Sequence, residues 1–563
     1  MSVVLSEHLP LLASAPDGIQ KLRGLILELA VRGKLVPQDP KDEPASELLK
    51  RIVQERARLG AERTCKKSKA MPLANDDIWP FELPNGWQWS RVGDLASVVR
   101  GVSYEKSQAS DVLLYGYLPL LRGHNINKLL NFEDLVFVPA NLISADQLIR
   151  RGDTVIAMSS GSAHLVGKAA QAVDDVDFGF GAFCGLIRAH SVELHQYFRF
   201  FFQTPLYRNR VAGHGKGIGI NNLQKGALLA LECPVPPLAE QHRIVAKVDE
   251  LMTLCDRLEA EQADAEAAHT RLVETLLGTL TQSTDAVELA ANWQRLDEHF
   301  HTLFTTEASL DALKQTILQL AVMGKLVPQD SNDEPASELL KRIAKERTRL
   351  EADGTCKKAK PVSPVNEDEQ AFKVPTGWTW ARFSQVAAVN GRLVDSQDYP
   401  DAMQVAPDSI EKGTGRLITR RTVREAGIRG PNQQFQAGQL LYSKIRPSLS
   451  KAVIVNFDGL CSADMYPLDA YIEPRFLLNQ ILSEVFLEQV RVAENRVKMP
   501  KLNQESLNVF LVCIPPLAEQ HRIIAKVDEL MALCDRLKAD LAESRKRQER
   551  LAATLIDAAL QAA

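Results

Sequence analysis

The stretch that decides the fold is Pro-Pro-Leu-Ala-Glu-Gln-His-Arg-Ile-Val-Ala-Lys-Val-Asp-Glu-Leu-Met-Thr-Leu-Cys-Asp-Arg-Leu, at residues 236–258. It returns at residues 515–537 with only a Val-to-Ile and a Thr-to-Ala exchange, so 21 of the 23 positions are identical. The two prolines end any preceding helix and allow a new one to begin. Glu240 then lies near the helix N-terminus, where the helix dipole favours an anion. Both copies are therefore predicted to be helices.

Apolar residues recur in both copies at spacings of 4, 3, 4 and 3, which is typical of the a/d seam of a coiled coil. The pattern continues through Leu272 and Leu276, and each helix is expected to span about 40 residues, or roughly 60 Å. Two interpretations are open. The two seams pack on each other, which their near-identity favours, or each seam packs on its own domain. The seam residues are Ile244, Val248, Leu251, Cys255 and Leu258 in the first copy and Ile523, Val527, Leu530, Cys534 and Leu537 in the second.

A second repeat precedes the first. Residues 33–59 return at residues 324–350 with 22 of 27 positions identical, and the apolar stretches before them also match. Each copy predicts a helix, a loop around Leu-Val-Pro-Gln-Asp, and a second helix from about Pro44 or Pro335. A shared Pro-x-Gly-Trp signal follows at residues 84–87 and 375–378, where Pro and Gly set a turn.

The two regions after these signals are unlike each other. Both are rich in short β-type runs punctuated by Gly, Asn, Asp and Pro, and each has a helix-like stretch near its end. We therefore predict an α+β protein with two mixed, mostly β domains held by long helices, in an internal pseudo-two-fold repeat. The predicted segments are residues 1–79 (helical), 80–235 (region one), 236–371 (helical), 372–514 (region two) and 515–563 (the second long helix).

Composition narrows the class of protein. A net charge of −4 argues against a wholly basic nucleic-acid binder but leaves room for local basic faces. None of the eight cysteines forms a Cys-x-x-Cys pair, so no zinc ribbon is expected. No apolar stretch reaches the 18 or so residues of a membrane span, and the first residues do not resemble a signal peptide. A reducing, cytoplasmic setting is expected.

Motifs for catalysis are lacking in the sequence. The double prolines follow Val and Ile, so they do not form the Asn/Asp-Pro-Pro-Tyr/Phe motif of an amino-methyltransferase. Residues 161–169 have one residue too many for a phosphate-binding loop and lack its hydroxyl. His214 alone suggests no metal site. We therefore predict no catalytic residue and no metal site in this chain.

The order of the repeats resembles the specificity subunit of Type I restriction-modification systems. The resemblance rests on the Pro-Pro-Leu-Ala-Glu-Gln entries at 236–241 and 515–520, the paired Gly-Lys-Leu-Val-Pro-Gln-Asp segments and the Pro-x-Gly-Trp entries. It implies that regions one and two are target recognition domains, each reading half of a bipartite, asymmetric site in double-stranded DNA. It further implies that the long helices pair as an antiparallel spacer and dock two methyltransferase subunits, which use S-adenosylmethionine. Restriction-translocase subunits, which use ATP and Mg²⁺, would join them, and this subunit itself would carry no cofactor.

DNA contacts are expected from cationic and amide side chains in loops of both regions, because Arg and Lys bind phosphates and Arg, Asn and Gln read base edges. The alternation in Lys444-Ile445-Arg446 predicts both cations on one strand face. An ordinary solvated loop is the competing interpretation for each candidate. The candidates are Arg100, Arg122, Asn125, Ser160, Lys168, Lys216 and Asn222 in region one and Arg420, Arg421, Lys444, Arg446, Lys498, Lys501 and Asn503 in region two. The stretches 220–223 and 499–503 are predicted to be equivalent.

Two other classes of function stay open at this stage. One is a complete enzyme with an unrecognised centre, against which the missing methyltransferase motif argues. The other is a coiled-coil scaffold that binds only proteins, which would show no preference for any DNA sequence.

Overall fold

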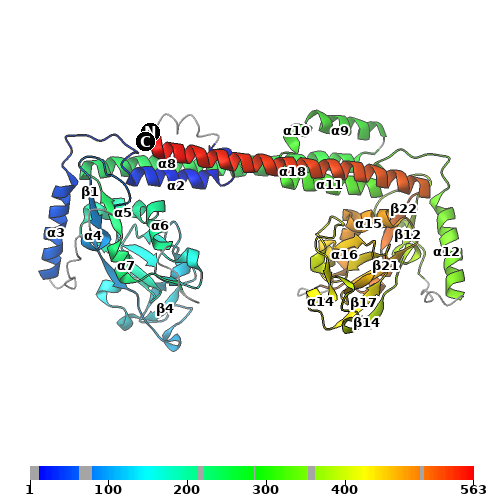
Figure 1. Cartoon of the computed structure of the whole chain (residues 1–563), viewed down its shortest axis with the longest axis horizontal. Helices are drawn as coiled ribbons and strands as arrows, with labels where there is room; N and C mark the ends of the chain where they lie inside the picture. The colour runs from blue at the N-terminus through cyan, green and yellow to red at the C-terminus, as the bar shows by residue number, and fades with distance from the viewer. Residues whose placement is uncertain are drawn as a thin grey trace. The chain divides into compact units, whose positions relative to one another are not determined.

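The computed structural model describes residues 12–61, 79–212, 221–284, 286–352, 362–494 and 500–562. Contacts divide the chain into two units, one formed by Met1–Asp264 with Arg545–Ala563 and the other by Ala265–Ser544. Each unit contains a helical frame and one strand-rich region, coloured blue to cyan in the first and yellow to orange in the second (Figure 1). The predicted α+β class and internal repeat are confirmed.

Two long helices supply residues to both frames. They are α8 (Leu238–Gln282) and α18 (Leu517–Ala562). Unit 1 contains the first part of α8 and the end of α18, whereas unit 2 contains the first part of α18 and the end of α8. The other helices of the frames are α2 (Gly18–Val31) and α3 (Ala45–Ala61) in unit 1 and α9 (Ala286–Glu298), α10 (Phe300–Leu303), α11 (Glu307–Val322) and α12 (Ala336–Ala352) in unit 2.

Each duplicated seam is buried inside its own unit. In unit 1 the first seam joins a cluster with the apolar face of α2, and Figure 1 shows α2 lying along α8. Arg23 of α2 binds Asp256 of α8 at 2.6 Å. In unit 2 the second seam joins a cluster with α11, and Lys314 binds Asp535 at 2.6 Å. The prediction that the two seams pack on each other is wrong, because each is already covered by the helix that precedes it in its own repeat.

The second halves of the long helices complete the other unit's frame. Val273, Leu277 and Leu280 of α8 lie in the cluster of unit 2, whereas Leu272 is 51 % exposed. The apolar stripe has thus moved one residue away from the strict seven-residue repeat that starts at Ile244. A straight α-helix drifts about 20° per heptad, so four heptads give about 80°, close to the 100° of one residue. The residues that α8 buries in unit 2 are therefore not those that the strict repeat predicts.

Region one contains two main sheets. The four-stranded sheet has the order β2-β9-β5-β7, and the three-stranded sheet has the order β4-β3-β8. Phe198, Phe201 and Tyr207 from two short helices are fully buried beside the frame. The elements are β2 (Ala96–Arg100), β3 (Tyr117–Leu121), β4 (Val136–Pro139), β5 (Thr154–Ala157), β7 (Ala169–Gln171), β8 (Gly179–Phe180), β9 (Cys184–Ala189), α5 (His195–Phe201) and α6 (Pro205–Ala212).

Region two repeats this plan and adds to it. Its four-stranded sheet has the order β13-β21-β18-β19, and a second sheet of five strands has the order β14-β17-β20-β15-β16. The extra strands β14 and β17 have no counterpart in the three-stranded sheet of region one. The elements are β13 (Ala387–Val389), β14 (Arg392–Asp395), β15 (Met403–Val405), β16 (Arg421–Thr422), β17 (Pro431–Phe435), β18 (Leu440–Ser443), β19 (Ala452–Ile454), β20 (Gly459–Ser462), β21 (Met465–Ala470), α15 (Pro474–Leu482) and α16 (Glu484–Ala493).

Each region leaves the frame and returns to it through one two-stranded ribbon. β1 (Gln88–Arg91) pairs antiparallel with β11 (Glu232–Val235) in unit 1. β12 (Thr379–Arg382) pairs in the same way with β22 (Leu511–Ile514) in unit 2. The two ends of each region therefore meet, so a region of different sequence can be held on an unchanged frame.

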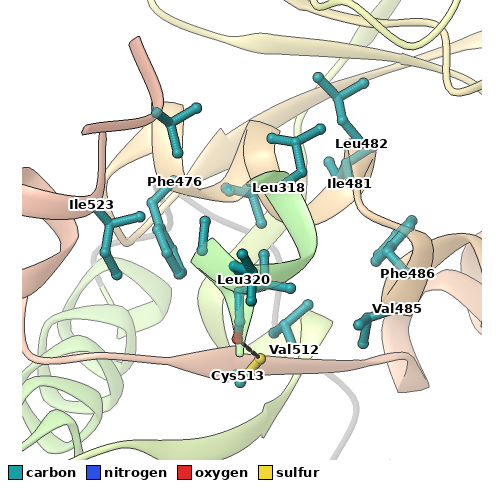
Figure 2. Packing of buried hydrophobic residues seen from close by; sticks show 14 of the residues in the cluster. Leu318, Leu320, Phe476, Ile481, Leu482, Val485, Phe486, Val512, Cys513 and Ile523 are labelled. Carbon is teal, nitrogen blue, oxygen red and sulfur yellow. Dashed lines mark hydrogen bonds between the residues drawn. The ribbon is translucent and has the colours of Figure 1, made fainter. Parts of the chain in front are cut away.

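The core of unit 2 joins the ribbon to the frame. Figure 2 shows Leu320 of α11, Phe476 of α15 and Phe486 of α16 around strand β22. The buried thiol of Cys513 donates a hydrogen bond to the carbonyl oxygen of Val322 at 2.8 Å. Burial raises the pKa of this thiol to about 12, so it stays protonated at neutral pH. Cys513 is a packing residue.

Candidate DNA interface

The two regions place equivalent loops at the same point of their four-stranded sheets. In region one the loop at 158–168 joins β5 to β7, and in region two the loop at 444–451 joins β18 to β19. A later segment of each region hydrogen-bonds to the start of this loop. The amide of Leu223 donates to the Met158 carbonyl at 2.7 Å, and the amide of Leu502 donates to the Lys444 carbonyl at 2.8 Å. Within the described residues, these bonds confirm the predicted equivalence for 221–223 and 500–502, and they align Asn222 with Lys501.

Region one presents a small polar surface at its loop. β6 (Ser159–Ser160) pairs with β10 (Asn221–Asn222), with Ser160 opposite Asn221 and Ser159 opposite Asn222, so two segments from distant parts of the sequence meet here. Ser160 and Lys168 are half-buried, and Asn222 is exposed. The Ser160 hydroxyl accepts a hydrogen bond from the Ser162 amide at 3.2 Å. Lys216 lies outside the described residues.

Region two presents a more basic surface at the equivalent loop. Lys444 lies over the Tyr466 ring, with its Nζ 5.5 Å from the ring centre, and Arg446 is exposed. The predicted strand alternation is wrong here, because β18 ends at Ser443 and Arg446 has a left-handed backbone with φ 45°. The turn, and not a strand, aims the Arg446 side chain. Lys498 lies outside the described residues.

Residues 500–503 of region two, next to this loop, contribute one cationic side chain and one residue that caps a helix. Lys501 Nζ lies 3.1 Å from the Asp464 carboxylate. Asn503 is exposed, but its side chain accepts the Ser506 amide at 2.7 Å and caps helix α17 (Gln504–Val509). Asn503 therefore has a structural role whether or not it contacts a ligand.

The arginines of 416–429 differ in their surroundings. Arg420 is exposed, with its guanidinium 5.4 Å from the centre of the Phe457 ring. Arg421 pairs with the exposed Asp408 at 3.2 Å. Exposed pairs of this kind contribute little to stability, so their exchange for a phosphate costs little. Arg416 instead pairs with Asp535 of α18, so it fastens region two to the frame.

The remaining candidates in region one separate into exposed and structural residues. Arg100 is exposed at the end of β2. The Arg122 guanidinium donates to the Asp134 carbonyl at 2.9 Å. Asn125 is fully buried: its oxygen accepts the Arg122 amide at 2.8 Å, and its nitrogen donates to the Glu133 carbonyl at 2.7 Å. The prediction that Asn125 contacts DNA is wrong in this conformation, because both of its polar atoms are used inside the domain.

Two features were missed by sequence reasoning. The first is β14, whose Arg392 and Leu393 are exposed at the edge of the enlarged sheet of region two. Its only sequence signal is the short run Arg-Leu-Val-Asp after Gly391. The second is a buried polar cluster around Glu240 and Glu519, described below, whose signal was the identity of both copies.

A cluster of metal ligands or a reactive thiol among the described residues' side chains would indicate a catalytic site. No group of three or more His, Cys, Asp or Glu side chains within them is placed to hold a metal ion. Burial raises the pKa of Cys184 and of Cys461 to about 12, so neither thiol supplies a thiolate nucleophile near neutral pH. Among the same residues no helix is both long and apolar enough to cross a membrane.

Comparisons with known proteins identify the class. Residues 84–267 match the family model of the Type I restriction modification DNA specificity domain. The Type I restriction enzyme EcoAI specificity subunit of Escherichia coli is 34 % identical over 577 aligned positions, which cover 96 % of this chain and 94 % of the relative. The EcoEI specificity subunit of Escherichia coli is 36 % identical, again over 96 % of this chain and 94 % of the relative.

One solved structure is also similar. A chain from a structure of a type I R-M system matches 85 % of this chain and 99 % of its own length, at 17 % identity and a TM-score of 0.49. The protein belongs to the family of Type I restriction enzyme specificity subunits, and its function is to supply DNA sequence specificity.

Proposed function

We propose that this chain reads a bipartite, asymmetric site in double-stranded DNA, with one half-site read by region one and the other by region two. The observation that carries this proposal is the contrast between the halves. The frame segments 33–59 and 236–258 are repeated almost unchanged at 324–350 and 515–537, while the loops at 158–168 and 444–451 occupy equivalent positions with different side chains. Two similar helical frames that hold recognition loops with different side chains suit a DNA site with two unlike halves. Half-sites on one face of B-DNA would lie about one helical turn, or roughly 10 base pairs, apart.

The contacts in each region would divide between phosphates and bases. Lys168 in region one and Lys501, Arg420 and Arg421 in region two would contact phosphates, because their cations lie at exposed or half-exposed positions. Ser160 or Asn222 in region one, and Lys444 and Arg446 in region two, would face base edges. Arg100 is a further phosphate contact in this proposal.

The catalytic steps would belong to partner subunits. The repeated frames would dock two methyltransferase subunits that use S-adenosylmethionine, and restriction-translocase subunits that use ATP and Mg²⁺ would complete the complex. This subunit would be non-catalytic and would hold no cofactor. The near-identity of the repeated frame segments supports two equal docking sites, because the same partner must be bound twice.

Mapping of methylated adenines tests the proposal. The chain is produced with its methyltransferase subunit in a host that lacks other adenine methylation, and methylated sites are read from the genome. One bipartite motif with a fixed gap is expected. The variant K444A/R446A should degrade one half of the motif and leave the other half intact. Methylation without sequence preference would contradict the proposal and favour a scaffold, and methyl transfer by this chain alone would favour a complete enzyme.

A further inference from the structure

A polar cluster fastens each region to its long helix. In unit 1 it consists of Gln38, Asp42, Trp87, Glu240 and Arg243, which we call the first joint. In unit 2 it consists of Gln329, Asp333, Trp378, Glu519 and Arg522, the second joint. The residues of each joint come from three separate segments: the loop after α2 or α11, the turn before the ribbon, and the first turns of α8 or α18.

One carboxylate holds the three segments of the first joint together. Glu240 is 1 % exposed, although it lies in the first turn of α8. One of its oxygens accepts the indole N–H of Trp87 at 2.9 Å, and the other accepts the side-chain amide of Gln38 at 3.3 Å. Arg243, one turn further along α8, binds Asp42 at 2.5 Å. The first strand of the ribbon begins directly after Trp87, so its position follows the position of Glu240.

The second joint has the same geometry. Glu519 is 1 % exposed and accepts the Trp378 indole N–H at 3.0 Å and the Gln329 amide at 3.2 Å. Arg522 binds Asp333 at 2.6 Å. Each distance agrees with its counterpart in the first joint to 0.1 Å, although the regions that follow are unlike in sequence. The joint is therefore independent of which region is mounted on it.

Close backbone packing leaves each joint little freedom. Gly33 has a φ of 68°, and a Cβ there would lie 2.5 Å from Pro84 and 2.9 Å from Trp87. Gly324 has a φ of 71°, and a Cβ there would meet Pro375 at 2.5 Å and Trp378 at 3.0 Å. The Ala45 amide also donates to the Gly86 carbonyl at 2.8 Å. In each joint, a buried carboxylate accepts two hydrogen bonds, and a glycine packs directly against the tryptophan that donates one of them. This arrangement holds the angle between the region and its long helix more firmly than a surface ion pair would.

We propose that Glu240 and Glu519 are positioning residues that fix the angle of each recognition region on its long helix and thereby the gap between the half-sites. This inference rests on the proposed function above. Neither carboxylate reaches DNA, because both are buried and each accepts hydrogen bonds from two side chains of the protein. Their loss should leave the bases read unchanged and broaden the range of gaps that the complex accepts.

The test compares two matched double variants of the full chain, each produced with the methyltransferase subunit. E240A/E519A removes both joint carboxylates. E250A/E529A makes the same change on the same helices at Glu250 and Glu529, whose side chains are 65 % and 66 % exposed and which each pair with a lysine one turn away. The methylated sites are sorted by the number of base pairs between the two half-sites.

E240A/E519A should raise methylation at gaps one base pair longer or shorter by about tenfold relative to the native gap, the ratio that ~1.4 kcal/mol of lost positioning gives. E250A/E529A should keep the single native gap. A folded E240A/E519A with one unchanged gap would overturn the inference, and so would an equal spread in both variants. If E240A/E519A does not fold, Q38A/Q329A, which removes one donor from each joint, decides by the same criterion. A wild-type complex without any bipartite motif would instead refute the proposed function.

Discussion

The burial of Leu272 and Leu277 in α8 distinguishes a helix with a strict seven-residue apolar seam from a straight helix. Leu272 continues the seam that starts at Ile244, yet it is 51 % exposed, whereas Leu277 is 4 % exposed in the core of unit 2. Removal of a buried leucine side chain costs about 2–5 kcal/mol, through lost apolar burial and the cavity that remains. A substitution at an exposed position usually changes stability by no more than about 0.5 kcal/mol. Leu277→Ala should therefore destabilise unit 2 strongly, and Leu272→Ala should not.

Thermal unfolding and amide hydrogen exchange measure this difference. A domain of 150–250 residues loses about 2–4 °C in Tm per kcal/mol, so Leu277→Ala should lower the transition of unit 2 by of order 10 °C. Exchange should rise along the end of α8 in Leu277→Ala and stay at the wild-type level in Leu272→Ala. Equal losses in both variants would refute the reasoning, because a supercoiled seven-residue seam would bury Leu272 as well.

Three further predictions follow from particular contacts. Burial raises the pKa of Glu240 and Glu519 above the usual 4.5, so the folded state binds more protons than the unfolded state in the pH range between the usual and the raised pKa. The free energy of unfolding should therefore fall as the pH rises through this range. Thermal unfolding at a series of pH values should show a flatter slope for E240Q/E519Q. Lys325 donates to the carbonyls of Thr281 and Ser283 at 2.6 and 2.9 Å, so Lys325→Met should cost about 1–3 kcal/mol and speed amide exchange at the end of α8, unlike Lys341→Met on the exposed face of α12. Asn125→Ala should destabilise region one by about 1–3 kcal/mol without a change in the methylated motif, and a lost base preference at unchanged stability would restore Asn125 as a DNA contact.

The repeats in the sequence predict the architecture, but they do not predict which helix packs against each seam. Heptad spacing at Ile244, Val248 and Leu251 correctly predicts a buried helix face. The spacing does not show which helix covers that face, because any helix with an apolar stripe could pack against it. Near-identity of the two seams favoured mutual pairing, whereas both copies are alike because each packs on a like helix, α2 or α11.

The candidate DNA contacts were predictable only in part, because residue type does not fix side-chain direction. Asn125 has the right chemistry for adenine, but it closes a turn in the same way as Ser409, which is also buried and accepts the Ala406 amide. Arg446 lies in a left-handed turn that a strand pattern does not reveal. By contrast, the equivalence of 220–223 and 499–503 was readable, since Leu223 and Leu502 are both buried before a short helix.

The boundary of sequence identity along the long helices has a structural cause. Identity is 21 of 23 over residues 236–258, but only seven of the 24 positions in 259–282 match those in 538–561. The first stretch packs on a helix that was duplicated with it. The second packs on segments that differ: Ala552 lies with Leu12 near the start of the chain, whereas its counterpart Val273 lies in a cluster with Leu303 of α10. A larger side chain is tolerated where its neighbours leave room, so the second halves have diverged while the seams and joints have not. The repeated joints and seams thus hold two regions of different sequence on the same local arrangement of helices.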